Sequence, residues 1–106
     1  MRIVLLQPIR LEEAQNISRG LLNGKVMVFD LQSCDVDVAQ DIVNFVSGTV
    51  FALNGKIQKI NDHGSIFVAT PPSVGLKNEL RGGFDGDDYG PTIAEWVNKK
   101  RDKGDF

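Results

Sequence analysis

The sequence predicts one α/β domain over residues 1–80, a two-layer sandwich whose elements follow the order βαβαββ. Short apolar runs rich in β-branched residues alternate with helical segments, as in folds that bury a largely parallel sheet. The longest helical pattern occupies residues 35–53. Two strand-like runs after it enclose a turn composition, which is typical of a hairpin. We therefore expect a mixed sheet with both helices on one face.

The first part of the chain indicates a strand, a helix and a second strand. Residues 2–7 and 25–31 are nearly continuous apolar runs of strand length. Between them, residues 11–22 place apolar side chains at helical spacing, and Asn23-Gly24 supplies a helix stop. This order predicts a βαβ unit with a right-handed crossover.

The most regular pattern predicts a helix that begins near Asp35 and ends at Asn54-Gly55. Asp35 or Asp37 can cap its N-terminus, and the spacing from Asp37 to Gln40 suits a capping box. Glycine tolerates the left-handed conformation that a helix stop requires. Apolar residues recur along this helix at spacings of three and four: Ala39, Ile42, Val43, Val46, Val50 and Leu53.

Gly48 lies in the middle of this helical pattern. A glycine there costs about 1 kcal/mol relative to alanine, and the close approach of a second backbone would compensate for that cost. The alternative is that the helix breaks at Gly48.

The remaining core residues predict a hairpin and an uncovered sheet face. Residues 56–60 alternate polar and apolar side chains like a half-exposed strand, and residues 65–70 form the next strand. Val74 and Leu76 suggest a further short edge strand. Because the helices cover only one sheet face, a second subunit is the economical cover for the other, and we expect a dimer.

Composition changes after residue 80. Residues 81–90 are rich in glycine and aspartate and indicate a linker. Residues 91–106 form an amphipathic peptide in which Ile93, Trp96 and Val97 share one helical face. This peptide is too short to be a stable isolated helix, so we expect it to order on binding, with an aromatic anchor.

Residue counts argue against several function classes. The 106-residue chain has a formal net charge of −2, which disfavours binding to nucleic acid. Its one cysteine, Cys34, excludes an internal disulfide framework and fits a reducing cytosol. Cys34 precedes a helix and has either a mildly lowered pKa or the character of an inert buried thiol. His63 lies in a turn composition, and we expect its side chain to be solvated. Because the sequence also offers no nucleophile constellation, we predict no catalytic residues, no metal site, no cofactor and no enzyme.

Two stretches resemble one protein family. The run VAQDIVNFVSGTVFALNGKIQKI and the later SIFVATPPSV are similar to the core of SepF, a bacterial cell-division family, over about Ile3 to Val74. The resemblance implies an α/β core that forms homodimers and assembles further in the cytoplasm, on the inner face of the cell membrane at the division septum. It implies binding of the C-terminal peptide of FtsZ in an apolar groove. Membrane contact is implied only through an N-terminal amphipathic helix that this sequence lacks, so we expect no lipid binding by this chain alone.

The resemblance also suggests roles for individual residues. Gly48 matches the family's Ser-Gly-Thr position and is the candidate for close subunit packing. The candidates for the partner groove are Phe45, Phe51, Lys59 and Phe67. For each phenylalanine, a place in the ordinary core is an equal alternative.

The C-terminal peptide has a resemblance of its own. DDYGPTIAEWVNKKR is similar to an FtsZ C-terminal tail, with Ile93 as the first anchor, Trp96-Val97 as the pair and a basic run after it, although Ala94 replaces a usual proline. It is either a groove ligand, fused artificially or present as a natural mimic, or an extra amphipathic helix. For the whole chain, the alternative to a division adaptor is a small-molecule- or nucleotide-binding regulatory module.

Overall fold

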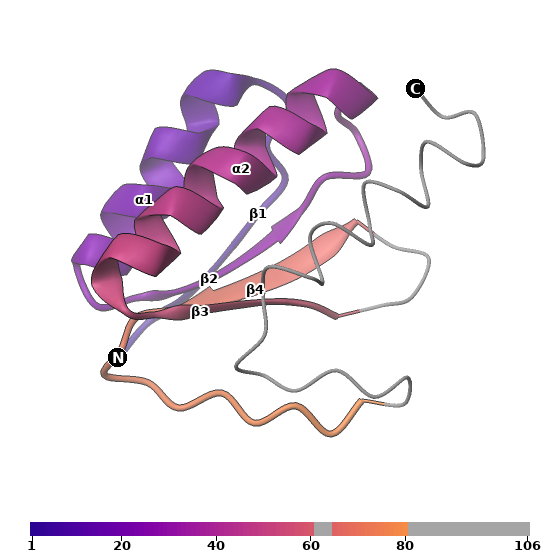
Figure 1. The fold of residues 1–106 in the computed structure, drawn as a ribbon. Coiled ribbons are helices and arrows are strands. Elements are labelled where there is room, and N and C mark those ends of the chain that lie inside the picture. Colours follow the sequence, from indigo (N-terminus) through magenta and orange to yellow (C-terminus); the bar gives the residue numbers. More distant parts are fainter. Residues whose placement is uncertain (61–64, 81–106) are drawn as a thin grey trace.

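The computed structural model describes residues 1–60 and 65–80, in which two helices cover one face of a four-stranded sheet (Figure 1). The predicted turn at 61–64 with His63, the linker at 81–90 and the peptide at 91–106 lie outside the described residues. The α/β architecture and the order βαβαββ are confirmed. The elements are β1 (Ile3–Leu6), the 3₁₀ helix η1 (Leu11–Glu13), α1 (Ala14–Leu22), β2 (Val26–Asp30), α2 (Val36–Leu53), β3 (Lys56–Lys59) and β4 (Ile66–Thr70).

The sheet is mixed, with the strand order β1-β2-β4-β3. β1 and β2 are parallel, while β2–β4 and β3–β4 are antiparallel. Because strand side chains alternate between faces, this register defines an outer sheet face that points away from both helices. Its residues are Ile3, Leu5, Val26, Val28, Asp30, Lys56, Gln58, Ile66, Val68 and Thr70.

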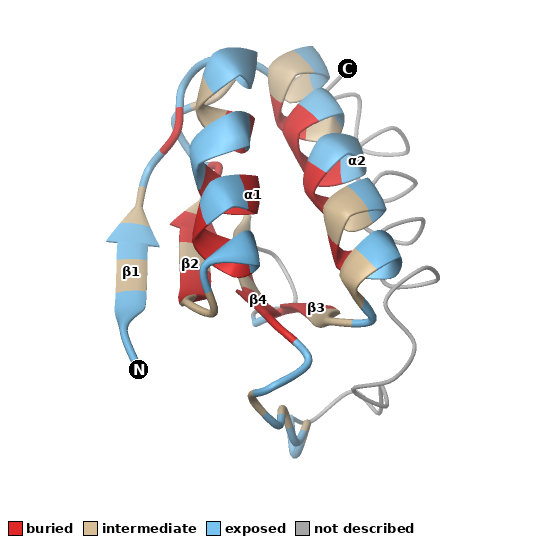
Figure 2. Ribbon diagram, turned by 90° about the vertical axis from the view of Figure 1, so that its left-hand side faces the viewer, coloured by how far each residue is buried: buried red, intermediate tan, exposed pale blue. Residues whose placement is uncertain are grey.

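The core lies between the helices and the opposite sheet face. Phe29 of β2 and Phe67 of β4 are directly paired in the sheet, and their rings stack with centroids 5.6 Å apart. Both side chains are fully buried. Figure 2 shows that the buried residues of α1 and α2 lie on the sides of the helices that face the sheet.

Helix α2 is continuous through Gly48, so the alternative of a helix break is wrong. Its N-cap is Asp35, in extended conformation, and no side chain caps it. The predicted capping box from Asp37 to Gln40 is therefore wrong, since the helix begins one residue before Asp37. At the other end, Asn54 adopts the left-handed conformation (φ 59°, ψ 31°) that closes the helix.

The glycine that permits close packing within the chain is Gly20, which the sequence pattern did not single out. A β-carbon on Gly20 would collide with the thioether of Met27, so the Met27 side chain can occupy its present position between α1 and β2 because position 20 has no side chain. A β-carbon on Gly48 would meet no atom within 4 Å, since Gly48 faces outward.

Two local predictions are corrected. β3 is not half-exposed, because Ile57, Gln58 and Lys59 are all buried. No strand forms at Val74 or Leu76 within the described residues. Instead, the segment after β4 lies on the side of the sheet away from the helices, and residues 76–80 border a cavity there with Gln58 (Figure 1).

Candidate interaction surfaces

The outward side of α2 carries large exposed aromatic side chains. Phe45 is 46% exposed and Phe51 is 73% exposed, with Gly48 between them. We call this surface, formed by Asp41, Phe45, Gly48, Phe51 and Ala52, the α2 outer face. The mean hydropathy of α2 is 1.3 over 18 residues, enough by length and composition for a membrane span, although core helices pass the same test. Here its inward residues belong to the protein core, and the outward ones include Phe45 and Phe51, which are exposed alongside the polar Asp41.

Helix α2 is held against α1 by a direct hydrogen bond. The hydroxyl oxygens of Ser18 on α1 and Thr49 on α2 are 2.6 Å apart. Thr49 is the residue after Gly48, so this contact fixes the rotation of α2 next to the glycine of its outer face. The aromatic side chains of that face therefore project from a firmly placed helix.

The second apolar surface is the β1 half of the outer sheet face. Ile3 is 64% exposed and Leu5 is 74% exposed, and Figure 2 shows β1 at the edge of the sheet, beside β2. A shallow cleft of about 350 Å³ lies between β1 and β4 and is bordered by Leu5, Val28 and Ile66 together with Asp30. An exposed edge strand without charge or proline invites pairing or packing with another chain.

Asp30 gives this apolar surface one fixed negative charge. Its carboxylate accepts hydrogen bonds from the backbone N–H of Gln32 (2.9 Å), the hydroxyl of Ser65 (2.8 Å) and the side-chain amide of Gln7 (3.3 Å). Burial raises the pKa of Asp30, but the three hydrogen bonds outweigh that effect and hold the pKa below its usual value. The cleft therefore combines aliphatic walls with an ionised carboxylate.

The other half of the outer sheet face is covered by the chain itself. Residues 76–80 pass over β3 and β4 and leave a cavity of about 350 Å³ beside Gln58 and Val68. Gln58 is 3% exposed, and its Nε2 donates a hydrogen bond to the carbonyl of Lys59 (3.2 Å). Within the described structure, its Oε1 accepts no hydrogen bond.

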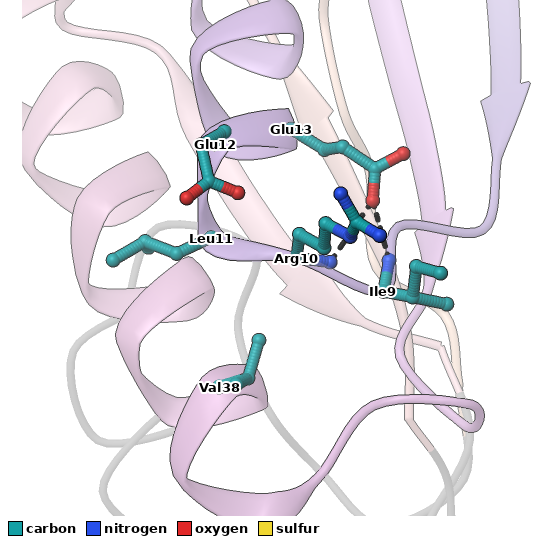
Figure 3. Close-up of a pocket in the computed structure, with 6 residues that line it drawn as sticks. All are labelled: Ile9, Arg10, Leu11, Glu12, Glu13 and Val38. Carbon is teal, nitrogen blue, oxygen red and sulfur yellow. Dashed lines mark hydrogen bonds between the residues drawn. The ribbon is translucent and has the colours of Figure 1, made fainter.

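A third concave region lies where η1 meets the start of α2 (Figure 3). It is an open cleft of about 820 Å³. The carboxylate of Glu13 accepts the backbone N–H groups of Ile9 (2.5 Å) and Arg10 (3.0 Å), and these bonds lower the pKa of Glu13. Glu13 thus fixes the loop that precedes α1. The cleft is lined by Ile9, Arg10, Leu11, Glu12, Glu13 and Val38.

Cys34 is an inert thiol, and the alternative of a lowered pKa is wrong. Partial burial raises the pKa of Cys34, and the negative charges of Glu13, Asp35 and Asp30 raise it further. Its Sγ also donates a hydrogen bond to the carbonyl oxygen of Pro8 (2.9 Å). Within the described residues, no cluster of three or more His, Cys, Asp or Glu side chains could hold a metal ion.

The structure does not bring the four predicted groove residues together. Phe67 is a core residue, and Lys59 is only 6% exposed because the register places it opposite Phe67, on the helix-covered side. Phe45 and Phe51 project from the other side of α2. Sequence reasoning missed Ile3 and Leu5, although their place in an apolar run at the start of the chain was a usable signal.

Comparison with known proteins identifies the family. The model of the SepF family of cell division proteins matches residues 3–76. The chain belongs to the SepF family. It is 37% identical to SepF of Agathobacter rectalis over 81 residues, which cover 76% of this chain and 44% of that protein. It is 39% identical to SepF of Lactobacillus gasseri over 99 residues, which cover 93% of this chain and 58% of that protein.

The chain thus spans about half the length of the SepF proteins it matches. Its fold also resembles the solved structure of a SepF-like protein from Archaeoglobus fulgidus, with a TM-score of 0.68. That match covers 78% of this chain and all of the other, at 15% identity, and therefore bears on the fold alone. SepF is a family of cell division proteins.

Proposed function

We propose that this SepF chain is a non-enzymatic division adaptor that self-associates and binds the C-terminal peptide of FtsZ. In this proposal, two copies meet on their α2 outer faces at Gly48, and the seam flanked by Phe45 and Phe51 receives the peptide. The outer sheet face supplies a second, separate contact between copies. In the full-length protein, the adaptor links FtsZ to the inner face of the cell membrane at the division septum.

The observation that carries the proposal is the apolar outward side of α2. A helix that covers a sheet in a monomer normally presents polar side chains to water. Here two phenylalanines flank a glycine that has open space above it. Removing such surfaces from water stabilises association by about 25 cal/mol per Å², and a glycine lets two helix backbones approach closely. Family membership supports the same reading, because division proteins act in assemblies.

Peptide binding tests the proposal directly. A fluorescent FtsZ C-terminal peptide titrated with the full chain is expected to show saturable anisotropy, and Phe51→Ser is expected to weaken binding at least about tenfold, the loss of a well-buried aromatic anchor. Leu22→Ser is the matched control, since Leu22 is 64% exposed, against 73% for Phe51, but lies on α1. Equal losses in both variants, or no binding by the parent, would refute the assignment. A thermal-shift series with nucleotides is expected to show no rise in Tm. The alternative of a regulatory module requires such a rise.

The C-terminal segment enters this proposal as part of the native protein. Because 99 of the 106 residues align with the L. gasseri protein, that alignment extends into residues 91–98 wherever it begins. This supports a native segment over an artificially joined peptide. Ile93, Trp96 and Val97 remain the residues that we propose anchor this C-terminal segment to its binding surface.

A further inference from the structure

The side-chain amide of Gln58 is buried, and its oxygen, Oε1, has no hydrogen-bond donor among the described residues. Its Nε2 is bonded to the carbonyl of Lys59, which fixes the orientation of the amide and leaves Oε1 as the free acceptor. In the described residues nothing donates to that oxygen. A buried acceptor without a partner costs about 1–3 kcal/mol, so native proteins usually supply a donor.

The space beside Gln58 specifies the kind of donor that would fit. The cavity of about 350 Å³ lies between Val68 on the sheet and residues 76–80, with Leu76 and Leu80 among its walls. An occupant should therefore be largely apolar and carry a single N–H group. An indole has this character, because it is a broad apolar ring whose only polar atom is a donor.

The chain carries one tryptophan, and it lies within reach. Trp96 is 16 residues beyond Leu80, which itself lines the cavity. The linker at 81–90 is rich in glycine and could span about 33 Å if extended, so it can turn back across a small domain. Linkage of this kind supplies a local concentration in the millimolar range, which makes weak docking sufficient.

We propose that residues 91–98 dock on the outer sheet face of their own chain, with the Trp96 indole in the cavity and its N–H donated to Gln58 Oε1. Ile93 and Val97, on the same helical face as Trp96, extend the contact over the aliphatic side chains around Val68.

This inference goes beyond the proposed function and does not depend on FtsZ binding. It concerns the outer sheet face, which is also the proposed second contact between copies. A docked segment and a second copy would compete for part of that face. The segment would then limit association through the sheet, while leaving the α2 outer face open.

Fluorescence of Trp96 in the full chain tests the docking. At dilutions where light scattering gives the monomer mass, we expect blue-shifted emission and slow quenching by acrylamide. Gln58→Leu removes the acceptor and should weaken docking about threefold to tenfold, the effect of one hydrogen bond, with a matching rise in quenching. Leu22→Ala, on α1 and therefore on the other face of the sheet, is the control and should leave quenching unchanged.

Thermal unfolding provides a second test, in which the coupling between two substitutions differs between the two cases. If the indole is docked, Gln58→Leu and Trp96→Phe each lower Tm, and the double variant loses less than the sum of the two single losses, because both substitutions remove the same bond. If the indole is elsewhere, Trp96→Phe has no effect, and Gln58→Leu changes Tm equally in the parent and in the Trp96→Phe background, because its lost Nε2 bond to Lys59 does not depend on Trp96.

Three results would overturn the inference: solvent-like Trp96 emission in the monomer, changes in Tm for Gln58→Leu and Trp96→Phe that simply add, or burial of Trp96 that appears only as the mass increases. The last would show docking between copies. Failure of self-association in all variants, with Trp96 still buried, would contradict the assembly proposal alone.

Discussion

Gly55 lies directly beneath the carbonyl oxygen of Thr70, where a β-carbon would collide with the backbone. The pairing of Lys56 with Thr70 at the start of β3 brings the two strands together immediately after α2. Asn54 makes the left-handed turn, and Gly55 then provides the clearance for β4. The junction between α2 and the sheet thus depends on two adjacent residues with different tasks.

We expect Gly55→Ala to destabilise the protein by about 1–3 kcal/mol, because the backbone of β4 must move to accommodate the methyl group. Urea unfolding followed by far-UV circular dichroism measures the effect. Gly20→Ala is the comparison, since there the obstacle is the flexible thioether of Met27 and the helix gains about 1 kcal/mol in propensity. A larger loss at position 20 than at position 55 would contradict this account.

Gly48→Ala should have opposite effects on folding and on association. The methyl group meets open space, and alanine in mid-helix should stabilise the subunit by about 0.5–1 kcal/mol. If two α2 helices pack at Gly48, the same methyl group separates them, and the average mass from light scattering should fall. Gln15→Ala on the exposed side of α1 should leave the mass unchanged. Unchanged association in Gly48→Ala would remove Gly48 from the interface.

The lowered pKa of Asp30 should make the stability of the folded protein sensitive to acid. An unfolded aspartate titrates near pH 3.9, and the hydrogen bonds in the folded protein hold the pKa of Asp30 lower. The stabilisation from its ionised form is therefore present above about pH 4 and is lost as the pH falls through the lower, folded pKa. Ser65→Ala removes one donor and should move acid unfolding, measured by circular dichroism, to a higher pH. Ser33→Ala, an exposed serine, should not.

Cys34 should react slowly with Ellman's reagent in the folded protein. Its raised pKa reduces the thiolate fraction near neutral pH, and its thiol is bonded to the carbonyl of Pro8. Because Cys34 is the chain's one cysteine, the urea-unfolded protein is a direct reference. The native rate should rise toward the unfolded rate as the pH increases. A native rate above the unfolded rate at pH 7 would show a lowered pKa instead.

The regular parts of the fold could be predicted from local patterns. Spacings of three and four placed α2 correctly from Asp35 to the stop at Asn54-Gly55, because one side of that helix is fully committed to the core. The apolar runs before and after α1 fixed β1 and β2. These elements depend on their own residues and on burial of a single face.

Burial and packing that depend on residues far apart in the sequence could not be predicted. Alternation shows which residues of β3 share a face, but it does not show that residues 76–80 cover Gln58 or that Lys59 lies opposite Phe67. The burial of Phe67 follows from its register in β4, opposite Phe29 and Lys59, whereas Phe51 is exposed because it lies on the outward side of helix α2. The role of Gly20 likewise depends on Met27, which no local pattern connects to it.

The composition of α2 has a consequence for damaged forms of the protein. An 18-residue segment with only two charged side chains packs its buried side against the sheet. A substitution that loosens the sheet would expose that buried side to water. Loss of stability in this domain should therefore be followed by aggregation in solution.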